Sequence, residues 1–364
     1  MVAVDAVYFT SGAHRLPAAM FTASHNPKEW NGFKLMKSNV DFFNVSDLER
    51  ILKSLPPKIP GNIKGKVGHE NIKEQYIEHV LSFIDTQNLK PMRIAVDTGN
   101  GAVGPILKSI LLKLPIEHVT KKNISDMRDE IRAGHYYFGC SFDTDGDRVI
   151  FIDEEGEIVN SSIIGAIMAR RFLKQYRYGK VVYGATVSNI VPDVVSAYGG
   201  EPIRERVGHT YISKRLKEVN GIIGIESSGH YYLKNNFYAD SGIVSFLTML
   251  EILSGQKKSL SRLAAEFSKY FSTPEITFST KGGSASGGKV DNSDEIIKKI
   301  AQNFEGYQID WLDGLTVTTS DFWLNLRPSN TEPLIRLNIE AKDEIILERV
   351  KKDLIALVRN VASQ

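Results

Sequence analysis

The sequence contains almost no cysteine and no long run of apolar residues. Cys140 is the only cysteine among 364 residues, so no disulfide can form within the chain and a reducing compartment is expected. No apolar run approaches the roughly eighteen residues that cross a membrane, and the N-terminal residues lack the basic and apolar stretches of a secretion signal. These absences predict a cytoplasmic protein without a membrane partner.

The chain also lacks a strong excess of charge of either sign. Its formal net charge is +2, and its 45 lysines and arginines are scattered rather than gathered into one run. This balance argues against a nucleic-acid partner, and it means that an anionic substrate must be bound by a local group of side chains. With 42% hydrophobic and 24% charged residues, the composition is typical of a globular protein with several domains. None of these features determines an oligomeric state.

Patterns typical of strands and helices alternate through the first two thirds of the chain. Apolar runs at 93–96 and 180–183 suit buried strands, and helical spacing of apolar residues follows each at 103–114 and 190–198. A longer helical pattern covers 161–175. This βαβ alternation predicts several α/β domains, whereas the order strand, helix, strands, helix in the last region predicts an α+β domain.

Three aspartates at alternate positions, Asp143, Asp145 and Asp147, are followed at once by Arg148 and lie between apolar runs at 136–142 and 149–152. Alternating carboxylates on a tight loop can direct several oxygens at one small cation such as Mg²⁺, which usually takes further ligands from phosphoryl groups. An EF-hand is disfavoured, because the glycine required at its sixth position is replaced by Arg148. The guanidinium instead suits a phosphoryl group beside the metal.

A second polar loop, residues 22–27, contains Ser24 and His25 after the apolar stretch 16–21. If Ser24 carries phosphate, this loop and the aspartate loop become one site. A Ser-His hydrolase is disfavoured, since adjacent side chains diverge and no Gly-x-Ser-x-Gly elbow is present. Lys34 follows shortly afterwards and is a candidate for proton transfer or for a phosphate contact.

Residues 224–230 combine glycines with Glu226, Ser228 and His230, the kinds of group that recognise sugar hydroxyls. An ordinary polar turn is the alternative. His209 stands on a glycine-containing turn, where proton transfer near neutral pH is natural, although a lone histidine is more often structural.

The loop at 327–333 contains an arginine, two hydroxyls, an amide and two stiffening prolines, which can converge on one phosphate. A hairpin that binds no ligand is the alternative. Two glycine-rich stretches, 99–104 and 283–289, resemble nucleotide-binding patterns. We interpret both as ordinary loops, because the first pattern often arises by chance and the second lacks the metal-binding hydroxyl.

In this order, the four loops at 22–27, 143–148, 226–230 and 327–333 resemble those of the α-D-phosphohexomutase superfamily, most closely its bacterial phosphomannomutase/phosphoglucomutase branch. The resemblance covers nearly the whole chain. It implies a multidomain α/β protein, with three α/β domains of mixed sheets and a C-terminal α+β domain around a central cleft. The implied domains are an N-terminally abbreviated phosphoserine-loop domain at 1–70, a metal-binding domain at 71–156, a sugar-binding domain at 157–268 and a phosphate-binding domain at 269–364.

Carried over residue by residue, the resemblance implies that Ser24 is the phosphoserine and that it binds Mg²⁺ together with Asp143, Asp145 and Asp147. Arg148 would contact the phosphoryl group, and Lys34 and His209 are the preferred candidates for proton transfer. The residues implied to bind substrate are His25, Glu226, Ser228, His230, Arg327, Ser329, Asn330 and Thr331.

The implied enzyme is an isomerase, an intramolecular phosphotransferase that interconverts hexose 1-phosphate and hexose 6-phosphate, with mannose, glucose or both as the sugar. The reaction would pass through the phosphoserine and a hexose 1,6-bisphosphate, which also serves as activator. The chain departs from the family pattern before Ser24, where an arginine that normally faces the phosphoserine has no counterpart. Two alternatives therefore stay open: a phosphoglucosamine mutase, and a catalytically weakened relative that binds sugar phosphates or acts as a scaffold.

Overall fold

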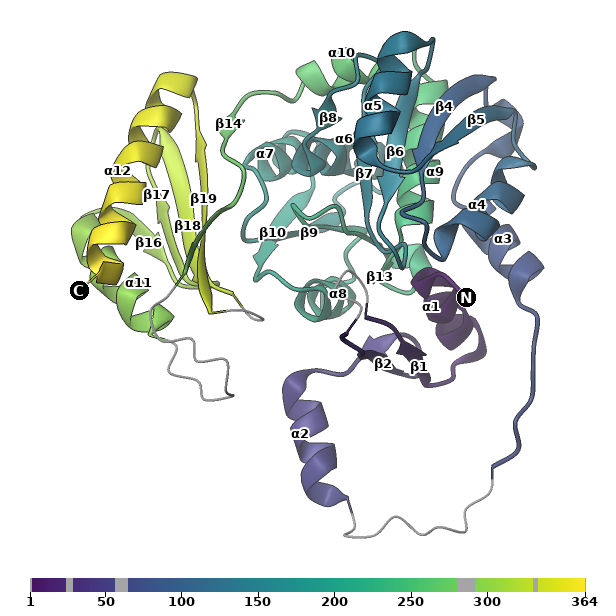
Figure 1. Ribbon diagram of the computed structural model, residues 1–364, viewed down its shortest axis with the longest axis horizontal. Coiled ribbons are helices and arrows are strands. Elements are labelled where there is room, and N and C mark those ends of the chain that lie inside the picture. The colour runs from purple at the N-terminus through teal and green to yellow at the C-terminus, as the bar shows by residue number, and fades with distance from the viewer. Residues whose placement is uncertain (1, 24–28, 56–64, 280–291, 330–332, 364) are drawn as a thin grey trace.

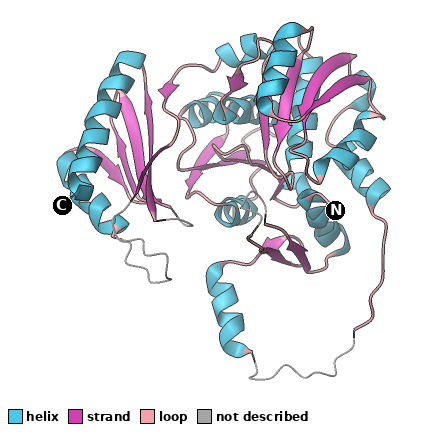
Figure 2. Ribbon diagram, in the orientation of Figure 1, coloured by secondary structure: helices cyan, strands magenta, loops and turns pink. Residues whose placement is uncertain are grey.

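The described residues form four β-sheets that follow one another along the sequence in the computed structural model (Figure 1). The structure describes residues 2–23, 29–55, 65–279, 292–329 and 333–363. Helices pack on these sheets, except for the helix Val45–Ser54, which extends away from the first sheet (Figure 2). None of the described helices is both long and apolar enough to cross a membrane.

The first sheet is small and antiparallel, with the order β1-β2-β3. Its core is a cluster in which Tyr8 and Met36 pack with Ala239, which comes from much later in the chain. Outside this cluster Phe21 and Phe33 are 78% and 64% exposed and pack against each other, with their ring centroids 4.7 Å apart. This sheet therefore depends on the rest of the molecule for part of its core. Its elements are α1 (Val4–His14), β1 (Ala18–Phe21), β2 (Phe33–Lys37), β3 (Asp41–Phe42) and α2 (Val45–Ser54).

The second sheet is mixed and has the order β5-β4-β6-β7-β8. Strand β4 pairs in parallel with β5 and β6, whereas β7 and β8 continue the sheet in antiparallel pairs. The central strand β6 is buried at every position, as expected for a strand covered on both faces. The elements are α3 (Lys73–Leu81), a 3₁₀ turn at Thr86–Asn88, β4 (Met92–Asp97), α4 (Val103–Leu111), β5 (Ile116–Lys121), α5 (Ile124–Ala133), β6 (Phe138–Phe142), β7 (Val149–Ile152) and β8 (Ile158–Val159).

The third sheet repeats the strand order and directions of the second, now as β10-β9-β11-β12-β13. Strand β9 pairs in parallel with β10 and β11, and two antiparallel strands follow. The elements are α6 (Ser161–Gln175), β9 (Lys180–Gly184), α7 (Ile190–Ala197), β10 (Glu201–Glu205), α8 (His209–Glu218), β11 (Ile223–Ile225), β12 (Tyr231–Leu233), a 3₁₀ turn at Lys234–Asn236, β13 (Ala239–Asp240), α9 (Gly242–Ser254) and α10 (Leu260–Ala265).

Helix α9 joins these two regions into one core. It is apolar on nearly all sides, and most of its residues are buried, which is typical of a helix enclosed by other elements. It follows the last strand of the third sheet but packs against β7 of the second sheet and against α3 and α6. One hydrophobic cluster therefore runs through both regions.

The fourth sheet has the order β14-β19-β18-β17-β16, with β15 also paired to β19, and is antiparallel. Helices α11 and α12 pack on its strands and complete a hydrophobic cluster of its own (Figure 1). The predicted order of strand, helix, strands and helix is confirmed. The elements are β14 (Phe271–Ser272), β15 (Ile276–Ser279), α11 (Ser293–Ala301), a 3₁₀ turn at Gln302–Phe304, β16 (Gln308–Asp310), β17 (Leu315–Thr318), β18 (Phe322–Pro328), β19 (Leu334–Ala341) and α12 (Glu344–Ser363).

Candidate active site

The aspartate loop at 143–148, called here the metal loop, is the hairpin connection between β6 and β7. Asp143 shapes the loop. Its Oδ1 accepts from the backbone N–H groups of Gly146 and Arg148, both at 3.1 Å, and its Oδ2 accepts from Nε of Arg148 at 2.9 Å. The segments next to the loop in the sequence are the strands β6 and β7 and not the two helices of an EF-hand, so the EF-hand alternative is wrong.

Backbone groups from three other segments hold the metal loop in place. The carbonyl groups of residues 144, 145 and 146 accept from the N–H groups of Ala102, Val4 and Gly242 at 3.0, 2.9 and 3.1 Å. The close approach explains the glycine pattern at 99–104. A Cβ on Gly101 would lie 2.1 Å from the carbonyl oxygen of Thr144. The glycines therefore serve packing here, in line with our interpretation of this stretch as an ordinary loop.

Lys34, on β2, joins the first sheet to the metal loop. Its Nζ lies 2.7 Å from Oδ2 of Asp145 and 2.5 Å from Oδ2 of Asp147, and both carboxylates are nearly buried. The pKa of Lys34 is raised because these carboxylates outweigh the opposing effect of burial, so the group stays an ammonium ion. The structure thus places Lys34, a candidate from the sequence, beside two of the three aspartates.

The donor atoms of the metal loop fit a small divalent cation. Each of its three aspartates offers a carboxylate oxygen within 4.8 Å of the others. Oδ1 of Asp147 is buried and has no hydrogen-bond partner among the described residues. Burial, together with the charge of Asp147, raises the pKa of Asp143 to about 7. Carboxylate oxygens and surplus negative charge are what Mg²⁺ selects.

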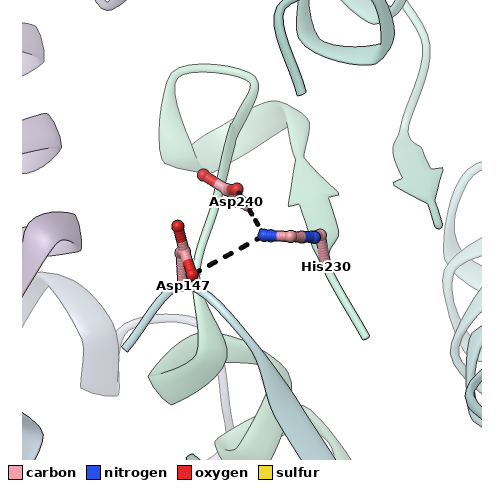
Figure 3. A group of neighbouring side chains, drawn as sticks. All are labelled: Asp147, His230 and Asp240. Carbon is pink, nitrogen blue, oxygen red and sulfur yellow. Dashed lines mark ion pairs between the residues drawn. The ribbon is translucent and has the colours of Figure 1, made fainter. Parts of the chain in front are cut away.

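His230 lies between two carboxylates that come from different sheets (Figure 3). Its Nε2 is 3.6 Å from Oδ1 of Asp147 and 3.9 Å from Oδ2 of Asp240. Burial alone would lower the pKa of His230, but Asp147 outweighs it and, with Glu226 and Asp240, raises the pKa to about 9. Burial, reinforced by Asp147, raises the pKa of Asp240 to about 8.

Residues 226–230, called here the reader loop, connect β11 to β12. Glu226 is held at both oxygens: the N–H of Gly208 donates to Oε1 at 3.0 Å, and the hydroxyl of Tyr232 donates to Oε2 at 2.6 Å. Ser228 Oγ lies 2.7 Å from Nδ1 of His230. The two loops touch through a β-bridge between Arg148 and His230.

His209 is the first residue of α8, and its ring meets that of Phe42 edge to face at a centroid distance of 4.6 Å. Burial lowers the pKa of His209 to about 4, and the positive charges of Lys34 and His230 act in the same direction. The imidazole is therefore neutral at pH 7 and can accept a proton.

A cavity of about 440 Å³ extends from the reader loop to the fourth sheet. Glu226, Ser228 and Arg327 line it, as do Arg336 and Glu275. Arg327 is 8% exposed, and its Nε is buried without a hydrogen-bond partner among the described residues. The remaining cavity residues include several hydroxyl groups, among them Ser161, Ser162, Thr186, Ser188, Ser227, Ser272 and Thr273.

The structure thus brings the described candidates together in two adjoining groups. Lys34, the three aspartates, Arg148 and His230 form one, with His209 nearby, and the cavity residues form the other. Glu226 belongs to both, since it lines the cavity and its Oε2 is 3.6 Å from Nδ1 of His230. Ser329 is buried and its N–H donates to Leu334 at 2.8 Å. Ser24, His25, Asn330 and Thr331 lie outside the described residues.

Several residues of the site were not predicted from the sequence. Asp240 forms an ion pair with His230, and the hydroxyl of Tyr232 donates to Glu226. Arg336 and Glu275 line the cavity together with Arg327. A signal existed for Arg336, which stands on the strand after the 327–333 loop at a position that alternation directs to the same face as Arg327. Asp240 gave no comparable signal, because it stands on β13, outside the reader loop whose His230 it approaches.

Comparison with known proteins assigns the chain to a protein family. Models of four consecutive domains match it: phosphoglucomutase/phosphomannomutase alpha/beta/alpha domains I, II and III at residues 1–56, 74–156 and 160–270, and the C-terminal domain at 286–357. A phosphomannomutase of Methanocaldococcus jannaschii is 33% identical over 98% of this chain and 82% of its own length. The chain belongs to the phosphoglucomutase/phosphomannomutase family. The family predicted from the four loops is confirmed.

Other members of the family agree with this assignment. A phosphomannomutase of Escherichia coli is 29% identical over 93% of this chain and 79% of its own length. A crystal structure of a phosphoglucomutase/phosphomannomutase family protein from Burkholderia thailandensis has a TM-score of 0.82 at 24% identity, covering 99% of this chain and 82% of that one. The predicted multidomain α/β fold and phosphohexomutase activity, an isomerase activity, are confirmed.

Proposed function

We propose that this family member interconverts hexose 1-phosphate and hexose 6-phosphate, with mannose or glucose as the sugar, through phospho-Ser24 and a hexose 1,6-bisphosphate. The proposal includes Mg²⁺ at the metal loop and the division into domains at 1–70, 71–156, 157–268 and 269–364. A fungal N-acetylphosphoglucosamine mutase, that of Aspergillus fumigatus, was crystallised with GlcNAc-6P and magnesium. Its structure matches this chain with a TM-score of 0.67 at 12% identity. That likeness supports the fold.

The observation that carries the proposal is the continuity of the site. The metal loop with Lys34 can bind one phosphoryl group, the arginines at the far side of the cavity can bind another, and the reader loop lies between them. A sugar with a phosphate at each end needs this arrangement. Because the sugar must present either end to the serine, contacts to hydroxyl groups and one fixed phosphate site serve both orientations.

Each side chain then has a role that follows from its charge. Mg²⁺, when bound, would offset negative charge on the transferring phosphoryl group. Lys34 and Arg148 add positive charge at the same place, and the raised pKa of Lys34 suits a permanent cation better than a base. His209, neutral at pH 7, is the proton acceptor, and an arriving phosphate would raise its pKa toward neutrality.

A coupled assay with mannose 1-phosphate, glucose 1-phosphate and glucosamine 1-phosphate, each with Mg²⁺ and the matching bisphosphate, tests the proposal. We expect turnover of at least one of the first two and none in the Ser24→Ala variant. Turnover of glucosamine 1-phosphate alone would assign a phosphoglucosamine mutase. Binding without turnover on any of the three would favour the sugar-phosphate-binding alternative, and substantial activity of Ser24→Ala would contradict the phosphoserine mechanism.

A further inference from the structure

Two arginines of the fourth sheet face each other across neighbouring strands. Arg327 on β18 is paired directly with Arg336 on β19 in the antiparallel register, so both side chains leave the sheet on the same face. Like charges at directly opposed positions destabilise a sheet unless a counter-charge is present. Both side chains line the cavity.

Glu275 supplies that counter-charge. It directly precedes β15, whose Ile276 and Thr277 pair with Leu337 and Arg336 on the other side of β19. Continued by one residue, this antiparallel register places Glu275 beside Asn338. Its carboxylate accepts from Nη1 of Arg336 at 2.5 Å, from Nη2 of Arg327 at 3.3 Å and from Nδ2 of Asn338 at 3.3 Å.

The carboxylate occupies only part of the donor set of Arg327, which it contacts at Nη2. Nε of Arg327 is buried and has no hydrogen-bond partner among the described residues. The hydroxyl of Thr273, which also lines the cavity, is likewise buried without a partner in the described part of the chain. An arginine fork fixed at one nitrogen and free at another is pre-organised to bind an anion from the cavity.

We propose that Glu275 is a positioning residue for phosphate binding: its carboxylate holds Arg327 and Arg336 as a pair and fixes the guanidinium of Arg327 so that its N–H at Nε can bind the phosphate that is not being transferred. The inference rests on the proposed function, because it assumes that this phosphate binds in the cavity. Without Glu275 the two guanidinium groups repel each other and sample other rotamers, and phosphate binding must then include the cost of ordering them.

The alternative role of Glu275 predicts a change of opposite sign. A carboxylate that merely placed negative charge in an anion site would weaken phosphate binding, so its removal would tighten binding. The direction of the change in affinity therefore separates positioning from repulsion, whatever its size.

The test measures binding of inorganic phosphate by calorimetry, and kcat and KM for the hexose 1-phosphate that the protein turns over, in the full-length protein and its Glu275→Ala variant. We expect phosphate affinity to fall at least about tenfold, with a matching rise in KM and a smaller change in kcat. Glu275→Asp, which keeps the charge on a shorter side chain, should recover part of the loss. Glu275→Gln keeps the size of the side chain and should also bind phosphate more weakly, which preserves the test if the alanine variant folds poorly.

Glu348→Ala is the matched control. Glu348 pairs with Lys351 on the exposed side of α12 in the same region, so its loss removes the same charge away from the cavity. It should leave phosphate affinity and KM unchanged. If the wild type binds phosphate and turns over a hexose phosphate, unchanged or tighter phosphate binding in Glu275→Ala would overturn this inference. The proposed function would then still stand. A wild type that neither binds phosphate nor turns over any hexose phosphate would overturn the proposed function, and the inference with it.

Discussion

The second and third sheets are two copies of one architecture that perform different tasks. Both place their first strand between the second and the third, pair it in parallel with each of them and end in two antiparallel strands. In each sheet the turn between the third and fourth strands lies at the site: the metal loop in one and the reader loop in the other. The metal loop has three carboxylates and an arginine, whereas the reader loop has one carboxylate, hydroxyl groups and an imidazole.

The comparison separates what the fold provides from what the residues provide. The repeated architecture brings equivalent turns together, where the backbone N–H of Val149 donates to the carbonyl of Gly229 at 3.2 Å and Arg148 bridges to His230. In the proposed function, the side chains alone decide which turn would hold a cation and which one would contact a sugar. Changes in one loop should therefore alter metal dependence and changes in the other should alter substrate affinity.

The largest expected effect comes from Asp147→Asn in the metal loop. The change removes charge from the carboxylate that contacts Lys34 and lies 3.6 Å from Nε2 of His230, so both metal affinity and transition-state stabilisation should fall. We expect kcat to decrease by about 10³-fold or more, as for loss of a main electrostatic group. Turnover and calorimetric binding of Mg²⁺ check this. Ser228→Ala in the reader loop, the contrasting variant, should retain Mg²⁺ affinity, and equal loss of that affinity in both variants would contradict the division of tasks.

A second expected effect is an opposite pH dependence of the two histidines. The folded-state pKa of His230, about 9, lies above the usual value of about 6.5. Its contribution to stability is complete below about pH 6.5 and is lost as the pH rises through about 9. For His209, with a pKa of about 4, the contribution is complete above about pH 6.5 and is lost as the pH falls through about 4.

Urea unfolding of wild type, His230→Gln and His209→Gln in EDTA at several pH values measures this difference. Each of the two pKa shifts corresponds to a change of up to about 3 kcal/mol in the free energy of unfolding. The difference in free energy of unfolding between wild type and His230→Gln should decrease as the pH rises from 6.5 to 9. The corresponding difference between wild type and His209→Gln should decrease as the pH falls from 6.5 to 4. The same trend for both histidines would show that their surroundings are not as distinct as the structure describes.

Glu226→Gln in the reader loop should have a smaller effect, mainly on substrate binding. The amide retains the shape of the side chain but loses charge and cannot accept at both ends from Gly208 and Tyr232. We expect kcat/KM to fall about thirtyfold, close to 2 kcal/mol, the usual range for a hydrogen bond to a charged group. Steady-state kinetics at saturating Mg²⁺ measure it. An unchanged Mg²⁺ requirement is expected, and a shift in that requirement would argue that the reader loop also acts on the metal.

The smallest expected effect is that of Tyr232→Phe, which removes only the hydroxyl that donates to Glu226. Tyr232 is fully buried, so the change leaves the packing intact but takes one donor from a buried carboxylate. The free energy of unfolding should fall by about 1 to 2 kcal/mol. The neighbouring Tyr231→Phe provides a control, because that hydroxyl donates to the backbone of Ser161 rather than to Glu226. Its kcat/KM should stay near that of the wild type, whereas that of Tyr232→Phe should fall.

Much of the fold could be predicted from the sequence where patterns are local. The helix predicted at 161–175 and the strand at 149–152 coincide with α6 and β7, because long helical spacing and short apolar runs are unambiguous. The two-residue strands β3, β8, β13 and β14 could not be predicted, since they exist only through their partners. The repeat of the second sheet in the third also escaped detection, because strand order is a property of pairing and not of residue identity.

The residues of the candidate site likewise divide into those that a local sequence pattern reveals and those that it does not. Motif residues such as Asp145 and Glu226 were predicted because several chemical groups stand close together in the sequence. Residues such as Asp240 and Glu275 stand outside the motifs that they complete, and no local pattern distinguishes them from ordinary surface or core positions. Side chains that complete a site from a distance become evident only when the sheets are assembled.

The three N–H groups that hold the metal loop have an electrical consequence. Val4 and Gly242 are the first residues of α1 and α9, and Ala102 directly precedes α4, so three helices begin at this loop. The N-terminus of a helix carries a partial positive charge from its aligned peptide dipoles. Three such ends, one from each of the first three regions, lower the energy of gathering aspartates at one point. The loop is thus prepared for its negative charge by the backbone itself, before any ion or lysine reaches it.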